Sequence, residues 1–219
     1  MKKQYAVIGL GRFGSAIAKA LYSDNNDVLG IDIREERIEE NQDIVSHAMI
    51  ADSTEEGSLK NIGIRNFDTV IVSIGDNMQA SILTVVILNE LGVKHIVAKA
   101  LNKHHGIVLS KVGATEVVFP ERDMGLRIAH KLMSPNIIDY IEISKEYSIE
   151  EMRIPSRIVG KSLIDLNIRA KYNVNVIAIR HDNGELEIAP DPNFTLSHND
   201  KMIVIGKNKD IKGLADFKD

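Results

Sequence analysis

The first thirty-two residues constrain the fold of this chain more than any other stretch. A short apolar run, residues 5–10, contains the start of a glycine turn, GLGRFG at residues 9–14, and a helical pattern follows at once over residues 15–22. A second apolar run, residues 28–31, ends on Asp32. Strand, glycine turn, helix, strand and acid in this order form the dinucleotide-binding fingerprint. The sequence therefore predicts a nucleotide site at its amino-terminal end.

Each residue of this fingerprint has a distinct expected role. Gly9 makes the tight turn at the strand end, and Gly11 lets the backbone approach a pyrophosphate without a Cβ in the way. Gly14 lets the helix lie close on the sheet. The helix start faces the phosphates with free N–H groups and a positive dipole end. Asp32 is placed to accept hydrogen bonds from ribose hydroxyls.

The next hundred residues alternate between strand and helix patterns. Asp52 or Ser53 is the expected N-cap of one of the helices. Gly63, Gly92 and Gly113 each follow a helical pattern and precede an apolar strand, which is typical of a helix C-terminus. The predicted strands are residues 46–51, 67–74, 95–100 and 116–119, and the predicted helices are residues 34–40, 78–91, 103–112 and 122–133. We expect an α/β fold with a right-handed, Rossmann-like doubly wound parallel sheet.

Ligands of such sheets lie outside the carboxyl ends of the strands, where this chain places charged and polar residues. These strand-end candidates are Gly11, Arg12, Asp32, Asp52, the segment from Ser73 to Asn77, Lys99 and Glu121. Together they suit a ribose, an adenine edge and a phosphate tail. For three of these residues, a purely structural role is the alternative to ligand binding: Asp52 as a helix cap, Lys99 as a solvent-reaching edge lysine, and Glu121 as a helix-start acid. Two acids and a phosphate can also share a divalent cation.

Residues 134–136 (Ser-Pro-Asn) end the first domain, which we place at residues 1–135, and a smaller α+β domain follows at residues 136–219. Its Asn183-Gly184 pair predicts a hairpin between residues 175–180 and 185–189. The other expected strands are residues 137–144, 148–155 and 202–205, the last stopping at Gly206, and the expected helices are residues 163–172 and 210–217.

Composition narrows the classes of function. The net charge of −4 argues against general affinity for nucleic acid or an anionic membrane. The absence of cysteine excludes disulfides and thiolate metal sites. No apolar stretch approaches the ~18–20 residues of a membrane span, so any link to a membrane is expected to go through a partner. The seven histidines show no metal-ligand spacing, and no catalytic residue is nominated.

Three functions fit a nucleotide-binding chain of this kind. A nucleotide sensor that regulates another protein needs nothing more than the site. A small NAD-dependent oxidoreductase needs a second domain with a proton donor and a substrate clamp, and none is visible. A redox-sensing transcription factor needs a basic helix-turn-helix, which is also absent from the pattern.

The motifs resemble the RCK family, which is also called KTN. The amino-terminal part carries the resemblance in YAVIGLGRFG, Asp32, ADSTEEGSL, DTVIVSIGDNMQAS and VVFPERDMGLRIA. The tail from SLIDLNIRAKYNVNVIAIR to KMIVIG resembles the RCK carboxyl-terminal (TrkA-C) domain. Together these cover nearly the whole chain, and the chain looks most like the cytosolic gating subunits of bacterial Ktr potassium-uptake systems.

The resemblance implies a regulatory protein, not an enzyme, that binds ATP or ADP, and NAD(H) less tightly, in its amino-terminal domain. Arg12 would reach the terminal phosphate in the neighbouring subunit's site, and Asp32 would hold the ribose. Asp52 and Ser53 would lie on the adenine side, Lys99 on the phosphates, and Glu121 near the γ-phosphate, where it would share Mg²⁺ or another cation. The implied nucleotide-site residues are Gly9, Gly11, Arg12, Phe13, Gly14, Asp32, Ile33, Arg34, Asp52, Ser53, Ser73, Gly75, Asn77, Lys99 and Glu121.

The resemblance also implies that the carboxyl-terminal domain binds cyclic di-AMP as an inhibitor on a two-fold dimer axis. The matching residues are Ile164, Asn167, Ile168, Arg169, Ala170, Asn175, Val176 and Pro192. Apolar side chains and Pro192 suit adenine faces, Arg169 suits a phosphate, and Asn175 offers amide hydrogen bonds. The alternative is that this segment is only a dimer interface.

The implied assembly is a homodimer, four of which form an octameric ring beneath a Ktr-type channel subunit. Residues 122–133 would be the crossover helix that swaps between protomers. The expected location is cytoplasmic, peripheral to the inner face of the cell membrane through that partner, with neither nucleic-acid binding nor direct membrane insertion.

Overall fold

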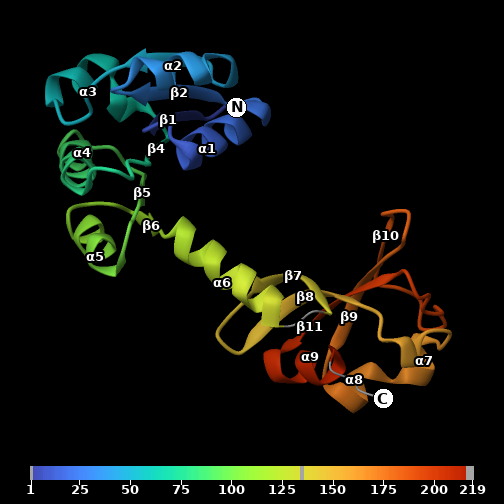
Figure 1. The fold of residues 1–219 in the computed structure, drawn as a ribbon. Coiled ribbons are helices and arrows are strands. Elements are labelled where there is room, and N and C mark those ends of the chain that lie inside the picture. Colours follow the sequence, from blue (N-terminus) through green and yellow to red (C-terminus); the bar gives the residue numbers. More distant parts are fainter. Residues whose placement is uncertain (1, 134–135, 216–219) are drawn as a thin grey trace. The chain divides into compact units, whose positions relative to one another are not determined.

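The computed structural model describes residues 2–133 and 136–215, which divide between two compact units, Met1–Asp123 and Met124–Asp219 (Figure 1). The helix α6, Pro120–Met133, begins in the first unit and continues in the second. The predicted domain boundary at Ser134 and Pro135 lies outside the described residues.

The first unit is built on a parallel sheet of six strands in the order β3-β2-β1-β4-β5-β6. In the central register, Tyr5 of β1 lies opposite Val28 of β2 and Thr69 of β4. The doubly wound sheet predicted from the glycine fingerprint is confirmed, with its order reversing between β1 and β4. The strands are β1 Gln4–Ile8, β2 Asp27–Asp32, β3 His47–Ile50, β4 Thr69–Val72, β5 Ile96–Lys99 and β6 Glu116–Val118.

Helices cover both faces of this sheet, and each face has its own core. Ala6 and Ile8 of β1 belong to one hydrophobic cluster, and Val7, the residue between them, belongs to the other. Because both faces are buried, the strands are continuously apolar instead of alternating. The helices are α1 Arg12–Ser23, α2 Glu35–Asn41, α3 Glu56–Ile62, α4 Met78–Glu90 and α5 Lys103–Lys111, with short 3₁₀ turns at Gln42–Ile44 and Ile64–Asn66.

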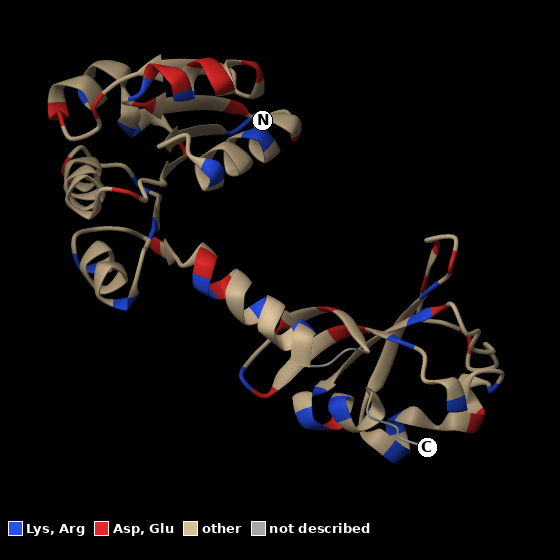
Figure 2. Ribbon diagram, viewed as in Figure 1, with Lys and Arg blue, Asp and Glu red and all other residues tan. Residues whose placement is uncertain are grey.

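Exposed helices of the first unit carry charged residues, and its buried helix is almost free of them. Figure 2 shows acidic residues gathered along α2, whose four glutamates face solvent, whereas α4 is free of charge until Glu90 at its end. Thr84, Val85 and Leu88 of α4 are fully buried. Gly63, Gly92 and Gly113 adopt positive φ angles of 72°, 79° and 120°, so the predicted helix-ending glycines are confirmed.

Two local predictions in the first unit are wrong. Neither Asp52 nor Ser53 caps α3, which begins at Glu56. Instead, the Asp52 carboxylate accepts from the N–H and the hydroxyl of Thr54, at 2.8 and 2.6 Å, and so closes a turn of its own before the helix. The helix α6 starts at Pro120 and not at residue 122, because proline suits the first turn of a helix, where its missing N–H would have no partner.

The second unit is a five-stranded sheet in the order β10-β9-β11-β8-β7, with every pairing antiparallel. Helices pack on the face that presents Met152, Met202 and Val204, all fully buried. The strands are β7 Ile137–Glu142, β8 Tyr147–Arg153, β9 Asn175–Arg180, β10 Leu186–Ile188 and β11 Lys201–Lys207; the helices are α7 Leu163–Leu166, α8 Ile168–Tyr172 and α9 Asn208–Ala215, with a 3₁₀ turn at Ser156–Ile158.

The predicted hairpin is confirmed, with β9 and β10 paired and Gly184 at φ 86°. The single helix predicted over residues 163–172 is two short helices, because Asn167 adopts the left-handed conformation at φ 43°. Strand β11 does not stop at Gly206, which continues the ladder opposite Ser148. The last residues of the predicted terminal helix, 216–217, lie outside the described part.

Within the second unit, α6 is attached to β7. The Arg127 guanidinium donates to both carboxylate oxygens of Asp139, at 2.6 and 2.8 Å, and lowers the pKa of Asp139. The His130 ring stacks on Tyr140 with centroids 4.1 Å apart. Across residues 2–133 and 136–215, each helix is too short or too polar to cross a bilayer.

Candidate functional site: a strand-end cleft and a second pocket

A cleft of about 950 Å³ lies at the carboxyl ends of the parallel strands in the first unit. All of the nucleotide-site residues predicted in this unit line it, except Gly14. The cleft therefore brings together residues from loops that are far apart in the sequence. From the amino terminus these are Gly9, Gly11, Arg12, Phe13, Asp32, Ile33, Arg34, Asp52, Ser53, Ser73, Gly75, Asn77, Lys99 and Glu121.

Gly14 lies beneath the cleft, where it sets the height of helix α1 above the sheet. A Cβ at this position would stand 1.9 Å from the Gly9 carbonyl oxygen and 2.4 Å from the Ser73 hydroxyl. That hydroxyl donates to the same carbonyl at 2.6 Å, and Gly9 turns with φ 91°. A larger residue at position 14 would push α1 away from the strand, so the third glycine has the packing role expected of it.

The amino terminus of α1 opens into the cleft without a side-chain cap. Gly11 is the N-cap residue, has no side chain to accept from the first turn, and is followed by a first turn free of acids. A Cβ at Gly11 would meet no atom within 4 Å, so the space above it is open. The N–H groups of Arg12, Phe13 and Gly14 lack intrahelical acceptors by helix geometry. This arrangement suits a bound anion.

Asp32 connects two of the loops that form the cleft. One carboxylate oxygen accepts from the Leu10 N–H at 2.8 Å, and the other accepts from the Arg34 N–H at 2.9 Å. The residue is only 6% exposed. A carboxylate has about four lone-pair positions, so two backbone donors leave capacity for ribose hydroxyls. Arg34 also approaches Asp76 on the β4–α4 loop, at 3.7 Å.

Lys99 and Glu121 form the shortest ion pair of the cleft, at 2.5 Å between Nζ and Oε1. The Lys99 side chain is 10% exposed and lies between Gly75 and the Phe13 ring. This burial excludes the alternative that Lys99 is a solvent-reaching edge lysine, since β5 is an interior strand. The Lys99 hydrogen bond is the main cause that lowers the pKa of Glu121.

Several lining residues were missed by sequence reasoning. Most lie beside a predicted residue, on the same strand end or loop. An extension of each predicted strand end by one or two positions would have found all of them except Arg37 and Ala80, which lie one helical turn after Arg34 and Asn77. The missed residues are Ile8, Arg37, Ala51, Thr54, Ala80 and Leu101.

The side chains do not form a metal site by themselves. Within residues 2–133 and 136–215, no three His, Asp or Glu side chains come together in a way that could hold a metal ion. Glu121 faces an ammonium group, which repels a cation. The described residues of one chain therefore do not fit a resident metal.

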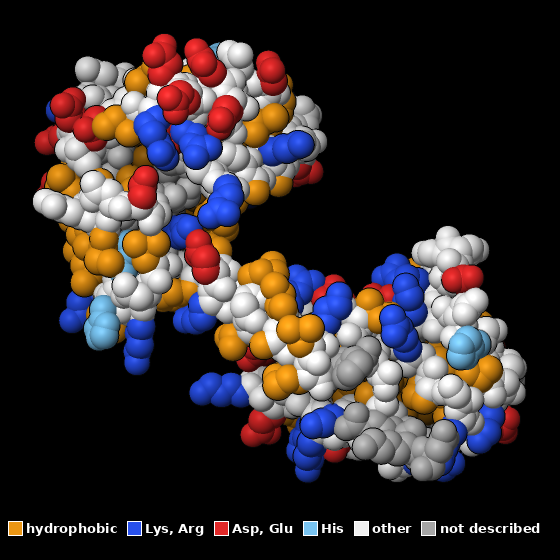
Figure 3. Space-filling model, in the orientation of Figure 1, with side chains coloured by type: hydrophobic (Ala, Val, Ile, Leu, Met, Phe, Trp, Pro, Cys, Tyr) orange, Lys and Arg blue, Asp and Glu red, His pale blue; other side chains and the backbone are white. Residues whose placement is uncertain are grey.

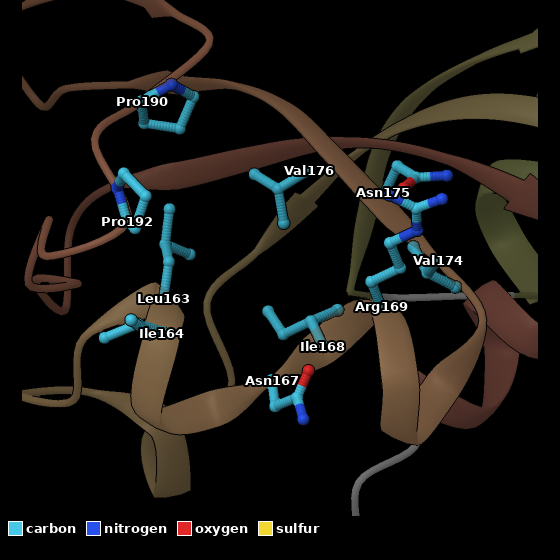
Figure 4. Close-up of a pocket in the computed structure, with 10 residues that line it drawn as sticks. All are labelled: Leu163, Ile164, Asn167, Ile168, Arg169, Val174, Asn175, Val176, Pro190 and Pro192. Carbon is cyan, nitrogen blue, oxygen red and sulfur yellow. The ribbon is translucent and has the colours of Figure 1, made fainter.

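A second pocket, of about 290 Å³, lies in the second unit (Figure 4). Pro190 and Pro192 stand at one end, Arg169 and Asn175 lie together at the other, and aliphatic side chains lie between them. The pocket is lined by Leu163, Ile164, Asn167, Ile168, Arg169, Val174, Asn175, Val176, Pro190 and Pro192.

Backbone hydrogen bonds hold the walls of this pocket together. The Ile164 N–H donates to the Pro192 carbonyl at 2.7 Å, and the Leu163 N–H donates to the Phe194 carbonyl at 3.1 Å. The left-handed Asn167 turns the chain so that α8 places Ile168 and Arg169 on the pocket.

Seven of the eight predicted residues of this region line the pocket, and Ala170 does not. Two residues after buried Ile168, Ala170 is rotated by roughly 200° around α8 and faces solvent. Leu163, Val174 and Pro190 were missed. Each lies within two residues of a predicted one, and the sequence offered no further signal.

The hydrogen bonds of Asp32 generate a prediction for the ligand-free protein. Asp32→Asn keeps one acceptor oxygen and replaces the other with a donor that faces a backbone N–H. We expect it to lower the free energy of unfolding by about 1–3 kcal/mol, the cost of a buried unsatisfied donor. The measurement is urea denaturation without nucleotide, with Asp76→Asn, 73% exposed at its side chain, as a control that changes stability by less than about 0.5 kcal/mol. Equal stability of both variants would contradict the role assigned to Asp32.

Solved structures support the fold of the whole chain. The chain is similar to the GsuK RCK domain with a TM-score of 0.66 and 15% identity, over 98% of this chain and 47% of that one. The GsuK channel bound to NAD matches with a TM-score of 0.54 and 22% identity, over 97% of this chain and 38% of that one. The chain thus spans under half of those longer proteins.

Sequence comparisons agree with this fold. Residues 5–120 match the TrkA-N domain family and residues 149–218 match the TrkA-C domain family. The chain is 52% identical to the Ktr system potassium uptake protein C of Bacillus subtilis, over 96% of this chain and 95% of that protein. It is 46% identical to the Ktr system potassium uptake protein A of the same organism, over 96% and 94%. The chain belongs to the TrkA-N/TrkA-C family of potassium-uptake proteins.

Proposed function

We propose that this chain is the regulatory subunit of a Ktr-type potassium-uptake system, which binds ATP or ADP in the strand-end cleft and thereby gates a membrane channel subunit. The observation that carries the proposal is the phosphate end of the cleft. There, the uncapped start of α1, the Arg12 guanidinium and the buried Lys99 ammonium surround one open volume. The identity of about half of all positions with two potassium-uptake proteins supports the transport role.

The residues of the cleft favour a sensor over the alternative, a small NAD-dependent oxidoreductase. Hydride transfer to a small substrate needs a positioned proton donor beside the nicotinamide. The described lining contains no His, Tyr or Cys, and its lysine is paired with Glu121. GsuK, of the same fold, has structures bound to NAD and to ADP, and we propose NAD(H) as a weaker ligand of this chain.

The proposed roles of the residues are those that the resemblance to the RCK family implies. Asp32 holds the ribose, Asp52 and Ser53 lie on the adenine side, and Lys99 contacts the phosphates. Arg12 contacts the terminal phosphate in the neighbouring subunit's site. A cation shared with Glu121 would have to take most of its ligands from the phosphate oxygens, since the protein offers too few.

The surface of α6 supports the proposed assembly into dimers and then an octameric ring. Five apolar side chains of this helix are exposed in the single chain, and Figure 3 shows hydrophobic atoms over this helix on the face in view. At about 100° per residue, Met124, Ile128 and Leu132 share one face of the helix, and Leu126 and Met133 share the opposite one. Uncovered apolar side chains gathered on one element mark interfaces. We propose that a second copy covers them and that α6 is the crossover helix.

Gating requires a ligand that binds one shape of the assembly better than another. ATP and ADP differ by one charged phosphoryl group, so only a group that contacts this phosphoryl distinguishes them. We assign this role to Arg12. In this proposal ATP favours active transport, and ADP favours the inactive state.

We propose that the second pocket binds cyclic di-AMP and that this ligand shuts transport. The aliphatic walls and the two prolines suit flat adenine faces, and Arg169 beside Asn175 suits a phosphate. The pocket of one chain, about 290 Å³, suits half of a two-fold symmetric ligand better than a whole one. The other half would be held by a second copy across a two-fold axis.

The role of Arg12 is tested by Arg12→Ala. Loss of a guanidinium that contacts only the terminal phosphate weakens ATP binding by about 10- to 100-fold, the usual worth of a charged hydrogen bond, while ADP affinity stays within about threefold. The measurement is calorimetry on the full assembly with both nucleotides. Lys19→Ala is the matched control, because it removes one charge from the exposed side of the same helix. Equal losses for ATP and ADP would count against this role.

The second site is tested by Arg169→Ala and Asn175→Ala. We expect each variant to weaken cyclic di-AMP binding at least about tenfold, through loss of phosphate or amide hydrogen bonds, with ADP affinity unchanged. Lys171→Ala on the same helix is the control, since Lys171 is exposed and does not line the pocket. Unchanged cyclic di-AMP affinity in both variants would show that the pocket was misassigned.

A further inference from the structure

The Glu121 carboxylate is paired with one cation and lies within the electrostatic reach of a second. It accepts from the Lys99 ammonium at 2.5 Å, and the Arg12 charge is also close enough to lower its pKa. The proposed function assigns Lys99 to the phosphates bound in this cleft, whereas it assigns Arg12 to the terminal phosphate in the neighbouring subunit's site. An anion of the protein itself therefore stands where the phosphate anion would bind.

The two partners of this pair differ in their freedom to move. Lys99 extends from an interior strand, and its side chain is 10% exposed, whereas the Glu121 side chain is 68% exposed at the start of α6. Glu121 can rotate into solvent without breaking the core, but Lys99 cannot follow it. A buried ammonium without a counter-ion is strongly unfavourable. Glu121 can therefore leave at low cost only when another anion reaches Lys99.

We infer that Glu121 is an internal competitor for the phosphate subsite, which neutralises Lys99 in the ligand-free protein and is displaced by the diphosphate of ADP when no divalent cation is bound. This inference rests on the proposed nucleotide function and adds a residue that opposes binding. It also adds a local consequence. Phosphate binding frees an acid in the first turn of α6, the helix that continues into the second unit.

The neighbouring acid, Asp123, provides a matched control. It lies in the same first turn of α6 and pairs with Arg122 at 2.8 Å, and it does not line the cleft. Asp123→Asn therefore removes the same charge from the same helix end, with the same loss of favourable dipole interaction, but it leaves the Lys99 pair intact.

The experiment measures ADP affinity by calorimetry for the full-length wild type, Glu121→Gln and Asp123→Asn, with EDTA present so that no divalent cation contributes. Glutamine keeps the size of the side chain but cannot compete as an anion for Lys99. We expect Glu121→Gln to bind ADP about tenfold more tightly than the wild type, in line with the strength of a charged hydrogen bond. Asp123→Asn should stay within about twofold of the wild type.

The outcomes separate the inference from the function on which it rests. Binding of ADP by the wild type with equal or weaker binding by Glu121→Gln overturns the competitor role and leaves the nucleotide site standing. A wild type that does not bind ADP overturns both. If Glu121→Gln does not fold, Glu121→Asp replaces it: the side chain shorter by one methylene holds Lys99 less closely, so tighter ADP binding supports the inference and unchanged binding contradicts it.

Discussion

The close approach of Gly14 to the Gly9 carbonyl is the contact on which the strand-end cleft depends. Because a Cβ at position 14 would stand 1.9 Å from that oxygen, only glycine lets α1 start directly above the end of β1. From this position the first-turn N–H groups face the open volume, and Ser73 and Asp32 fasten the adjoining loops by hydrogen bonds to the same turn. The remaining charges of the site gather around an anion-binding helix start that is already in place.

Two cations of the cleft, Arg34 and Lys99, lie beside acids of the same chain. Arg34 lies near Asp32 and Asp76, and Lys99 is paired with Glu121, so the ligand-free site contains little unpaired buried charge. An anionic ligand must therefore replace the carboxylates that already neutralise these cations. In the proposed function, such an exchange would lower the affinity for the nucleotide and would give the ligand differential contacts with two states of the protein.

Sequence reasoning predicted the parallel sheet well because the signals were local: glycines at helix ends, a glycine turn and continuous apolar strands. It also predicted most lining residues, since the ends of parallel strands meet at one edge. Sequence reasoning failed where a short polar side chain could form a hydrogen bond or a backbone conformation other than the one expected. Asp52 bonds to Thr54 and not to a helix start, and Asn167 breaks a helix by adopting a left-handed conformation. The Lys99–Glu121 pair joins residues 22 positions apart, and the sequence around each of them gives no signal that predicts the contact.

We propose that the cleft holds an adenine nucleotide as a signal and not as a reagent. The most direct test incubates the full-length protein with ATP, ADP or NADH, measures binding by equilibrium dialysis, and then quantifies the recovered nucleotide by chromatography. We expect saturable binding of ATP and ADP, weaker binding of NADH, and recovery of each nucleotide chemically intact. Consumption of ATP or NADH at the pace of an enzyme, or no binding of any of the three, would contradict it.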